Sequence, residues 1–187
     1  MSKALMLIAD GLEECEGLIV VDLLRRGGVE VTTASINEGT TILSSHGITF
    51  ETDCSALALE NWMGFDAVIL PGGHGGTMNL KASPLVAEIL KAYAADENKL
   101  VTAICAAPSI LGDLGLLEGK RATCFPGFES HLKGAEYTAE PVTEDGRFVT
   151  GNGLGAAIPF GLHILSRLEG PKIAEEIRQK IQYPFAI

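Results

Sequence analysis

The chain has 187 residues, of which 47% are hydrophobic and 20% are charged, and its formal net charge at pH 7 is −10. This acidic surplus argues against nucleic acid and anionic membranes as partners, because both bind basic surfaces. No apolar run reaches the roughly 18 to 20 residues of a transmembrane helix and no signal-peptide pattern opens the chain, so we expect a single globular domain over residues 1–187.

The first 70 residues alternate short apolar runs with helical patterns, which predicts a βαβ opening and hence a parallel sheet. Acidic residues favour the N-terminus of the first helix, and two glycines end it. The expected elements are a strand over 4–9, a helix over 13–26, a strand over 29–35, a hairpin over 40–52, a short helical piece over 53–60 and a strand over 65–70.

The second part of the chain continues the alternation after a glycine-rich segment, residues 71–76, that we expect to be a loop with unusual backbone freedom. We find no internal repeat, linker or low-complexity tract, so one α/β domain is predicted. The expected elements are a helix over 84–95, a strand over 100–104, a helix over 109–117, a strand over 121–124, a helical turn over 129–133, a hairpin over 140–150, and helices over 153–168 and 171–181.

Cys105 lies where the strand over 100–104 gives way to the next helix. Pro108 fits the first turn of that helix, where a missing N–H has no consequence. A sharp strand-to-helix turn exposes one side chain and directs helix-end N–H groups at it. We therefore expect the Cys105 thiol to ionise readily. The alternative is a small buried hydrophobe, a role that suits the other cysteines, although Cys124 ends a strand that could lie nearby.

The four cysteines, at positions 15, 54, 105 and 124, form no Cys-x-x-Cys pair, and none has a histidine at zinc-ligand spacing. We expect free thiols in a reducing cytoplasm. The glycines of 151–156 differ in spacing from a dinucleotide motif, and 71–76 lacks the Lys-Ser/Thr pair of a phosphate loop. No metal and no cofactor are therefore expected.

The carboxyl ends of parallel strands meet at one edge of a sheet, where α/β proteins place their sites. Three expected strands lead there to chemically useful residues: Glu16 follows the first, Gly72 and Gly73 follow the fourth, and Cys105 follows the fifth. A carboxyl group buried beside a thiolate would have a raised pKa and, when protonated, could donate a hydrogen bond to sulfur. The alternative for Glu16 is a solvated helix residue.

A cysteine nucleophile usually works with a histidine base. Ala106 directly follows Cys105, so the chain has no adjacent Cys-His pair. His74 is the best placed of the four histidines, while His131 and His163 fit surface or helix positions. Hydrolysis of the amidotransferase or protease type would require a histidine within reach of Cys105.

Three ordered segments resemble the ThiJ/PfpI superfamily, in the parkinsonism-associated deglycase branch and among its bacterial members. This resemblance covers nearly the whole chain, and it implies a flavodoxin-like α/β fold: a three-layer sandwich with a mostly parallel sheet and helices on both faces. It also implies a homodimer. The matching segments are residues 11–16, 70–73 and 103–108, together with 22–26 and 123–126.

The same resemblance implies roles for the residues at the strand ends. Cys105 would be an easily oxidised nucleophile, and Glu16 would be its protonated partner. Backbone groups near the oxyanion position would come from Gly72, Gly73 and Ala106.

Other matches concern the dimer, and some positions depart from the family pattern. Asp22 and Arg26, whose i,i+4 spacing alone fits a surface pair, would fall near the dimer contact. One branch of the family has a histidine at the position of Phe125. The segment 153–156 lacks a family threonine, and His46 replaces an arginine in the hairpin.

The resemblance implies two classes of function. In the first, Cys105 thiolate attacks a small reactive aldehyde or a glycated protein, as in a glutathione-independent glyoxalase or a protein deglycase, while Glu16 and His74 move protons. In the alternative, oxidation of Cys105 makes the protein an oxidative-stress sensor or a redox-regulated chaperone. Many members also carry an older name that refers to thiazole monophosphate biosynthesis.

Overall fold

The computed structural model describes residues 1–185, so that residues 186 and 187 of the domain expected over 1–187 lie outside the described part. Its centre is a seven-stranded sheet with the order β10-β11-β7-β6-β1-β2-β5, in which every pairing is parallel except that of β10 with β11. The strands are β1 (Lys3–Ile8), β2 (Glu30–Ser35), β5 (Cys54–Ser55), β6 (Ala67–Leu70), β7 (Leu100–Ile104), β10 (Val142–Asp145) and β11 (Phe148–Gly151).

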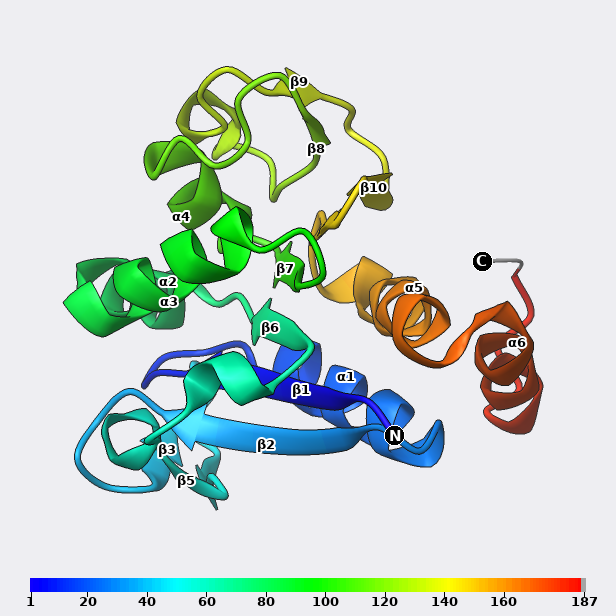
Figure 1. The fold of residues 1–187 in the computed structure, drawn as a ribbon, viewed down its shortest axis with the longest axis horizontal. Helices are drawn as coiled ribbons and strands as arrows, with labels where there is room; N and C mark the ends of the chain where they lie inside the picture. Colours follow the sequence, from blue (N-terminus) through cyan, green and yellow to red (C-terminus); the bar gives the residue numbers. More distant parts are fainter. Residues whose placement is uncertain (186–187) are drawn as a thin grey trace.

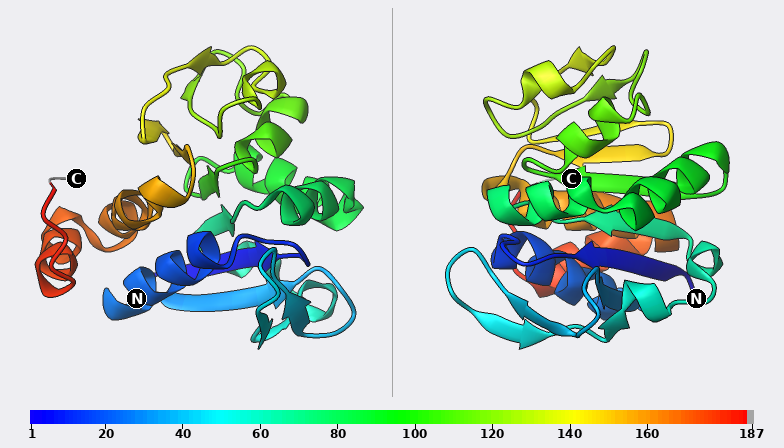
Figure 2. Two further views of the ribbon diagram at one scale, coloured as in Figure 1. Left: turned by 180° about the vertical axis from the view of Figure 1, so that it is seen from behind. Right: turned by 90° about the vertical axis from the view of Figure 1, so that its left-hand side faces the viewer.

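Helices cover both faces of this sheet (Figures 1 and 2). One face carries α1 (Glu14–Arg26), α5 (Ala157–Glu169) and α6 (Pro171–Lys180), and the other carries α2 (His74–Ala82), α3 (Pro84–Ala95) and α4 (Pro108–Asp113). The predicted three-layer sandwich is therefore confirmed. Among the described residues, no helix combines the length and the apolar character that crossing a bilayer would need.

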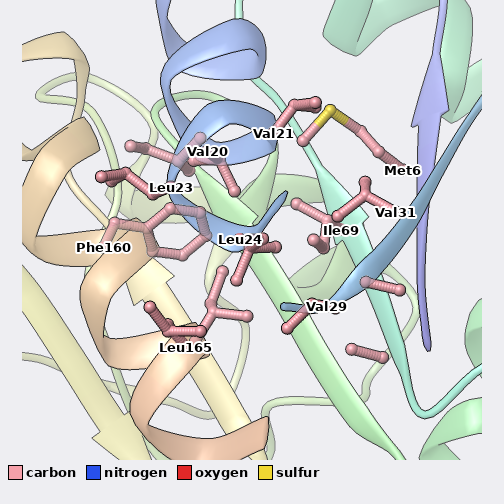
Figure 3. Close-up of a cluster of buried hydrophobic side chains, with 14 of the residues drawn as sticks. Met6, Val20, Val21, Leu23, Leu24, Val29, Val31, Ile69, Phe160 and Leu165 are labelled. Atoms are coloured by element: carbon pink, nitrogen blue, oxygen red, sulfur yellow. The ribbon is translucent and has the colours of Figure 1, made fainter. Parts of the chain in front are cut away.

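The core has two halves, one on each face of the sheet. Strands β6, β7 and β11 are buried at every residue, as expected for parallel strands covered on both sides. Figure 3 shows the half beneath α1 and α5, where Leu23 and Leu24 face Phe160 and Leu165. The two helices approach closely because α5 has no side chain at Gly161, where a β-carbon would lie 2.8 Å from Leu23 Cδ1.

Several elements differ from the expectations. Residues 71–76 do not form a loop throughout, because α2 already begins at His74. The piece expected over 53–60 is β5 followed by a single 3-10 turn, η1 (Ala56–Ala58). The expected hairpin over 40–52 is present as β3 (Thr41–Leu43) and β4 (Thr49–Glu51), whereas β9 (Glu136–Tyr137), which pairs with β8 (Arg121–Ala122), was not predicted.

The strand order places the ends of three strands together. From β1 the chain passes to β2 on one side, while β6 lies on the other side of β1 and β7 lies beyond it. Such a switch in direction opens a crevice at the carboxyl edge of a parallel sheet. The residues that follow β1, β6 and β7 lie at this edge.

Candidate active site

Cys105 lies on the turn between β7 and α4 and has a positive φ of 64°. A residue with a β-carbon rarely adopts this conformation, which is found where surrounding contacts impose it. The Cys105 N–H donates to the Gly151 carbonyl at 2.9 Å, and the Cys105 carbonyl accepts from the Phe125 N–H at 2.7 Å. Pro108 begins α4, which ends at Asp113 and is shorter than predicted. The sharp turn with a half-buried thiol is therefore present.

Glu16 lies in the first turn of α1 and is only 1% exposed. Its N–H donates to Glu13 Oε2 at 2.7 Å, so Glu13 caps the helix. The pKa of Glu16 is raised to about 7, because burial and the charge of Glu13 outweigh the hydrogen bonds from Cys105 and the Gly72 N–H, which lower it. Within the described residues, Glu16 Oε2 has no partner of good hydrogen-bond geometry. The carboxyl group therefore retains its proton up to nearly neutral pH.

Gly72 and Gly73 allow the three chain segments of the site to meet. A β-carbon at Gly72 would overlap Glu16 Oε2 and the β-carbon of Cys105. At Gly73, where φ is +90°, a β-carbon would overlap the Glu13 nitrogen. The Glu13 N–H also donates to the Gly72 carbonyl at 3.0 Å. The start of α1 can thus approach the loop after β6 only because both positions are glycine.

The protonation of Cys105 differs from the expectation. The pKa of Cys105 is raised to about 12: burial and the charge of Glu16 raise it, and the N–H groups of Gly73 and Ala106 offset part of this rise. The prediction that this thiol ionises readily by itself is therefore wrong, because two backbone donors offset only part of the desolvation. With a carboxyl pKa of about 7, the pair holds one proton over a wide range above neutral pH.

His74 is the first residue of α2 and is exposed. Its ring packs against Phe128 with a centroid separation of 6.2 Å. In the part of the chain that the structure describes, no hydrogen bond links His74 to Cys105 or Glu16. The geometry therefore brings together Glu16, Gly72 and Cys105, but it does not join His74 to them.

Asp22 and Arg26 form an exposed ion pair on α1, with 2.6 Å between Asp22 Oδ2 and Arg26 Nε. A groove of about 360 Å³ lies beside Asp22 and is otherwise apolar. Its lining residues are Leu18, Ile19, Asp22, Leu23, Ile158 and Ile181.

Glu13 and Glu14, the two acidic residues just before Glu16 at the start of α1, also have defined contacts. Glu13 caps the helix that carries Glu16, and Glu14, which is 6% exposed, lies 2.9 Å from Nδ1 of His46. An acidic residue three positions before another at a helix start is a capping signal, which could have revealed Glu13. Glu13, Glu14 and His46 each offer a ligand atom within 4.8 Å of the others, so they could hold a metal ion.

Comparison with known proteins adds to this geometry. The model of the DJ-1/PfpI family matches residues 2–167. The chain is 37% identical over 180 residues to protein dj-1beta of Drosophila melanogaster. This match covers 95% of this chain and 95% of that protein. It is 31% identical over 173 residues to the glutathione-independent glyoxalase DJR-1.2 of Caenorhabditis elegans, covering 91% of this chain and 90% of that protein. It also resembles the crystal structure of a DJ-1 superfamily protein from Salmonella typhimurium, with a TM-score of 0.93, 35% identity, and coverage of 99% of this chain and 100% of that chain.

Proposed function

The chain belongs to the DJ-1/PfpI family, and from this premise we propose that Cys105 and Glu16 act together on reactive aldehydes. The reaction would be that of a glutathione-independent glyoxalase or a protein deglycase. The observation that carries the proposal is the contact of a strained, half-buried cysteine with a buried carboxyl group that titrates near pH 7. The similarity to a relative named as a glyoxalase supports the same class.

The first step is addition of sulfur to a 2-oxoaldehyde. The Cys105 proton passes to Glu16 as the sulfur electron pair forms a bond to the aldehyde carbon. The electron pair of the C=O bond moves to oxygen, which takes the proton from the Glu16 carboxyl, and a hemithioacetal results. The N–H groups of Gly73 and Ala106, which lower the pKa of the thiol, would stabilise negative charge in this step.

The second step is an internal rearrangement. Glu16 carboxylate removes the hydrogen of the former aldehyde carbon as a proton, the C–H electron pair forms a C=C bond, and the ketone electron pair moves to oxygen to give an enediolate. Glu16 returns the proton to the neighbouring carbon, and the hydroxyl proton of the sulfur-bearing carbon passes to the enediolate oxygen, which gives the thioester of a 2-hydroxy acid. Water cleaves the thioester, restores the Cys105 thiol and releases the acid. The sum is addition of one water to the 2-oxoaldehyde. His74 directly follows Gly73 and remains the predicted second proton carrier, a role that His74→Ala would test.

The decisive experiment measures lactate formation from methylglyoxal in the absence of glutathione. Cys105→Ala should reduce the rate by at least about a hundredfold, because the nucleophile is lost. Cys54→Ala, which removes another partly buried free thiol, should leave the rate nearly unchanged. Equal rates for the wild type and Cys105→Ala would contradict the proposed function.

A second candidate function is oxidant sensing through Cys105. It is favoured by the partial exposure of Cys105 and by the N–H groups of Gly73 and Ala106, which could stabilise a negative charge on its sulfur, whereas Cys124 is fully buried. A peroxide would transfer one oxygen atom to sulfur in each of two steps, with loss of water or alcohol, to give a sulfinate. Mass spectrometry after mild peroxide treatment should find two added oxygens selectively at Cys105. Even oxidation of all four cysteines would contradict this role.

A further inference from the structure

Phe125 is held beside Cys105 by a direct backbone hydrogen bond. Its N–H donates to the Cys105 carbonyl at 2.7 Å, and on the other side of the turn the Cys105 N–H donates to the Gly151 carbonyl at 2.9 Å. The segment that carries Phe125 and the end of β11 therefore flank the nucleophile. Neither can move far without breaking a hydrogen bond to it.

The ring of Phe125 extends from one of these flanking segments to the other. A β-carbon at Gly153, two residues beyond Gly151, would lie 3.3 Å from Cδ2 and 3.8 Å from Cε2 of the ring. The ring therefore lies beside Gly153, in the space that a side chain at this position would enter. The backbone of Phe125 is thus hydrogen-bonded to the Cys105 turn, while its ring lies against the segment that follows β11.

The ring nevertheless keeps a face open to solvent. Phe125 is 47% exposed, and Leu154, which follows Gly153, is 49% exposed. Scattered exposed apolar residues are ordinary on protein surfaces. Here, however, the Phe125 N–H donates to the carbonyl of the nucleophile, and Leu154 lies three residues beyond Gly151, whose carbonyl accepts from the N–H of the nucleophile. We call these two exposed apolar side chains the Phe125 wall.

We propose that the Phe125 wall makes the site selective for 2-oxoaldehydes with a bulky apolar substituent, such as an aryl group, over methylglyoxal. This inference rests on the proposed function of Cys105. When sulfur bonds to the aldehyde carbon, the substituent is attached to the adjacent carbon and can contact a ring beside the turn. An aryl group would leave water and gain edge or offset-stacked contact with Phe125.

The charge near the wall favours a neutral substituent. Glu129 lies a few residues beyond Phe125, and its Oε2 accepts a hydrogen bond from the Gly127 N–H at 2.9 Å. Hydrogen bonding lowers the pKa of this carboxylate, and burial together with its charge raises the pKa of Cys124, the residue directly before Phe125. An anionic substituent would be repelled, whereas an aryl or branched alkyl group would not.

The test compares kcat/KM for phenylglyoxal and methylglyoxal. In Phe125→Ala, the ratio of the two values should fall by about tenfold, while the value for methylglyoxal should change by less than about threefold, because the backbone N–H that contacts Cys105 is retained. Phe125→Leu, which keeps apolar volume, should be intermediate. Leu57→Ala, at a 59% exposed leucine in η1, should leave the ratio unchanged. A ratio in Phe125→Ala within twofold of the wild-type ratio, or an equal loss for both substrates, would overturn the proposal.

A second measurement separates this inference from the proposed function. Alkylation of Cys105 by N-phenylmaleimide and N-ethylmaleimide, followed by peptide mass spectrometry, requires no turnover. The phenyl-to-ethyl rate ratio should fall severalfold in Phe125→Ala. If the wild type converts neither aldehyde but this ratio falls in Phe125→Ala, the proposed function is wrong, while contact of apolar groups with the Phe125 wall is supported. If the ratio is unchanged, the inference that the Phe125 wall selects apolar substituents is wrong, whether or not the wild type is an enzyme.

Discussion

Glu16 Oε2 and the β-carbon of Cys105 both lie where a side chain at Gly72 would begin. The first turn of α1, the loop after β6 and the turn after β7 therefore meet at one point. Because Glu16 is buried and Cys105 is half-buried there, a negative charge on Glu16 raises the pKa of the thiol. The carboxyl and the thiol are accordingly one titrating unit, and the predictions below depend on their contact.

Gly72→Ala should destabilise the protein and slow the reactions of Cys105. The new β-carbon would overlap Glu16 Oε2 and the Cys105 β-carbon and would lie 3.0 Å from the Ile104 carbonyl oxygen. Overpacking of this kind costs about 1–3 kcal/mol. Urea denaturation and the rate of Cys105 alkylation measure the two effects. Gly39→Ala is the control, because nothing lies within 4 Å of its added methyl group, and comparable stability of the two variants would show that the overlap is absent.

The rate of Cys105 alkylation should rise with pH in a step centred near pH 7. The pair loses its first proton there, and the resulting carboxylate can take the thiol proton during attack. In Glu16→Gln, this step should disappear and the rate should rise only at the higher pH where the thiol itself ionises. Glu14→Gln should retain the step, since the pKa of Glu14 is lowered and its charge is constant near neutral pH. An unchanged step in Glu16→Gln would mean that another group controls the thiol.

Glu16→Gln should also remove part of the pH dependence of stability. The pKa of Glu16 rises from 4.5 to about 7 on folding, so between these values the folded state binds more protons than the unfolded state. Wild-type stability therefore falls as pH rises through this range. The stability of the variant relative to the wild type should grow by about 2–3 kcal/mol between pH 5 and pH 8. Urea denaturation at the two pH values checks this, and a constant difference would place the titration elsewhere.

The turn at Cys105 was predictable because its determinants are local. An apolar run followed by cysteine, two alanines and Pro108 defines a strand, a turn and a helix start without reference to the rest of the chain. The sheet, the α1 start and the β3–β4 hairpin follow from equally local patterns. By contrast, β8 and β9 have two residues each, and their pairing depends on contacts distant in sequence.

The chemistry of the site was harder to predict from the sequence than the fold. Glu13, Glu14 and Glu16 look alike in one acidic helix start, so the choice of Glu16 relied on the family resemblance, and in the structure the approach of Gly72 places it at Cys105. The pKa of the thiol depends on how much water is removed from it, and burial is a property of the assembled fold. The sequence predicts N–H groups at the helix end, which lower the pKa of the thiol. It does not show whether desolvation, which raises the pKa, outweighs them.

Asp113 should be important for stability because it joins three segments. Its carboxylate lies 2.5 Å from Lys81 Nζ in α2, 2.9 Å from His131 Nδ1 and 2.7 Å from Lys133 Nζ, and its side chain is 15% exposed. Burial raises its pKa, but hydrogen bonds from these partners hold it well below the usual range. Asp113→Asn should lower the free energy of unfolding by about 1–3 kcal/mol at pH 7.

The pH dependence of this loss has a definite sign. A carboxyl whose pKa is depressed on folding contributes stability above its unfolded pKa of about 3.9, and that contribution is lost as pH falls further. The difference between the wild type and Asp113→Asn should therefore shrink below pH 4, as measured by thermal unfolding at pH 3 and pH 7. Asp22→Asn, in an exposed pair, should have a smaller effect. Equal effects of the two substitutions would contradict the role assigned to Asp113.

The apolar groove beside α1 leads us to predict a homodimer. Leu18, at its margin, is 43% exposed, and the Asp22–Arg26 pair lies next to it on α1. Pairing of two such faces would bury the groove and remove its apolar surface from water. Light scattering should then give twice the chain mass of 19.7 kDa for the wild type.

Leu18→Glu should shift the measured mass of the protein towards that of one chain, because the new charge would have to be desolvated in the contact. Leu57→Glu, at a leucine of similar exposure on η1, should leave the measured mass unchanged. A monomeric wild type would refute the homodimer, and a dimeric Leu18→Glu would place the contact on another face.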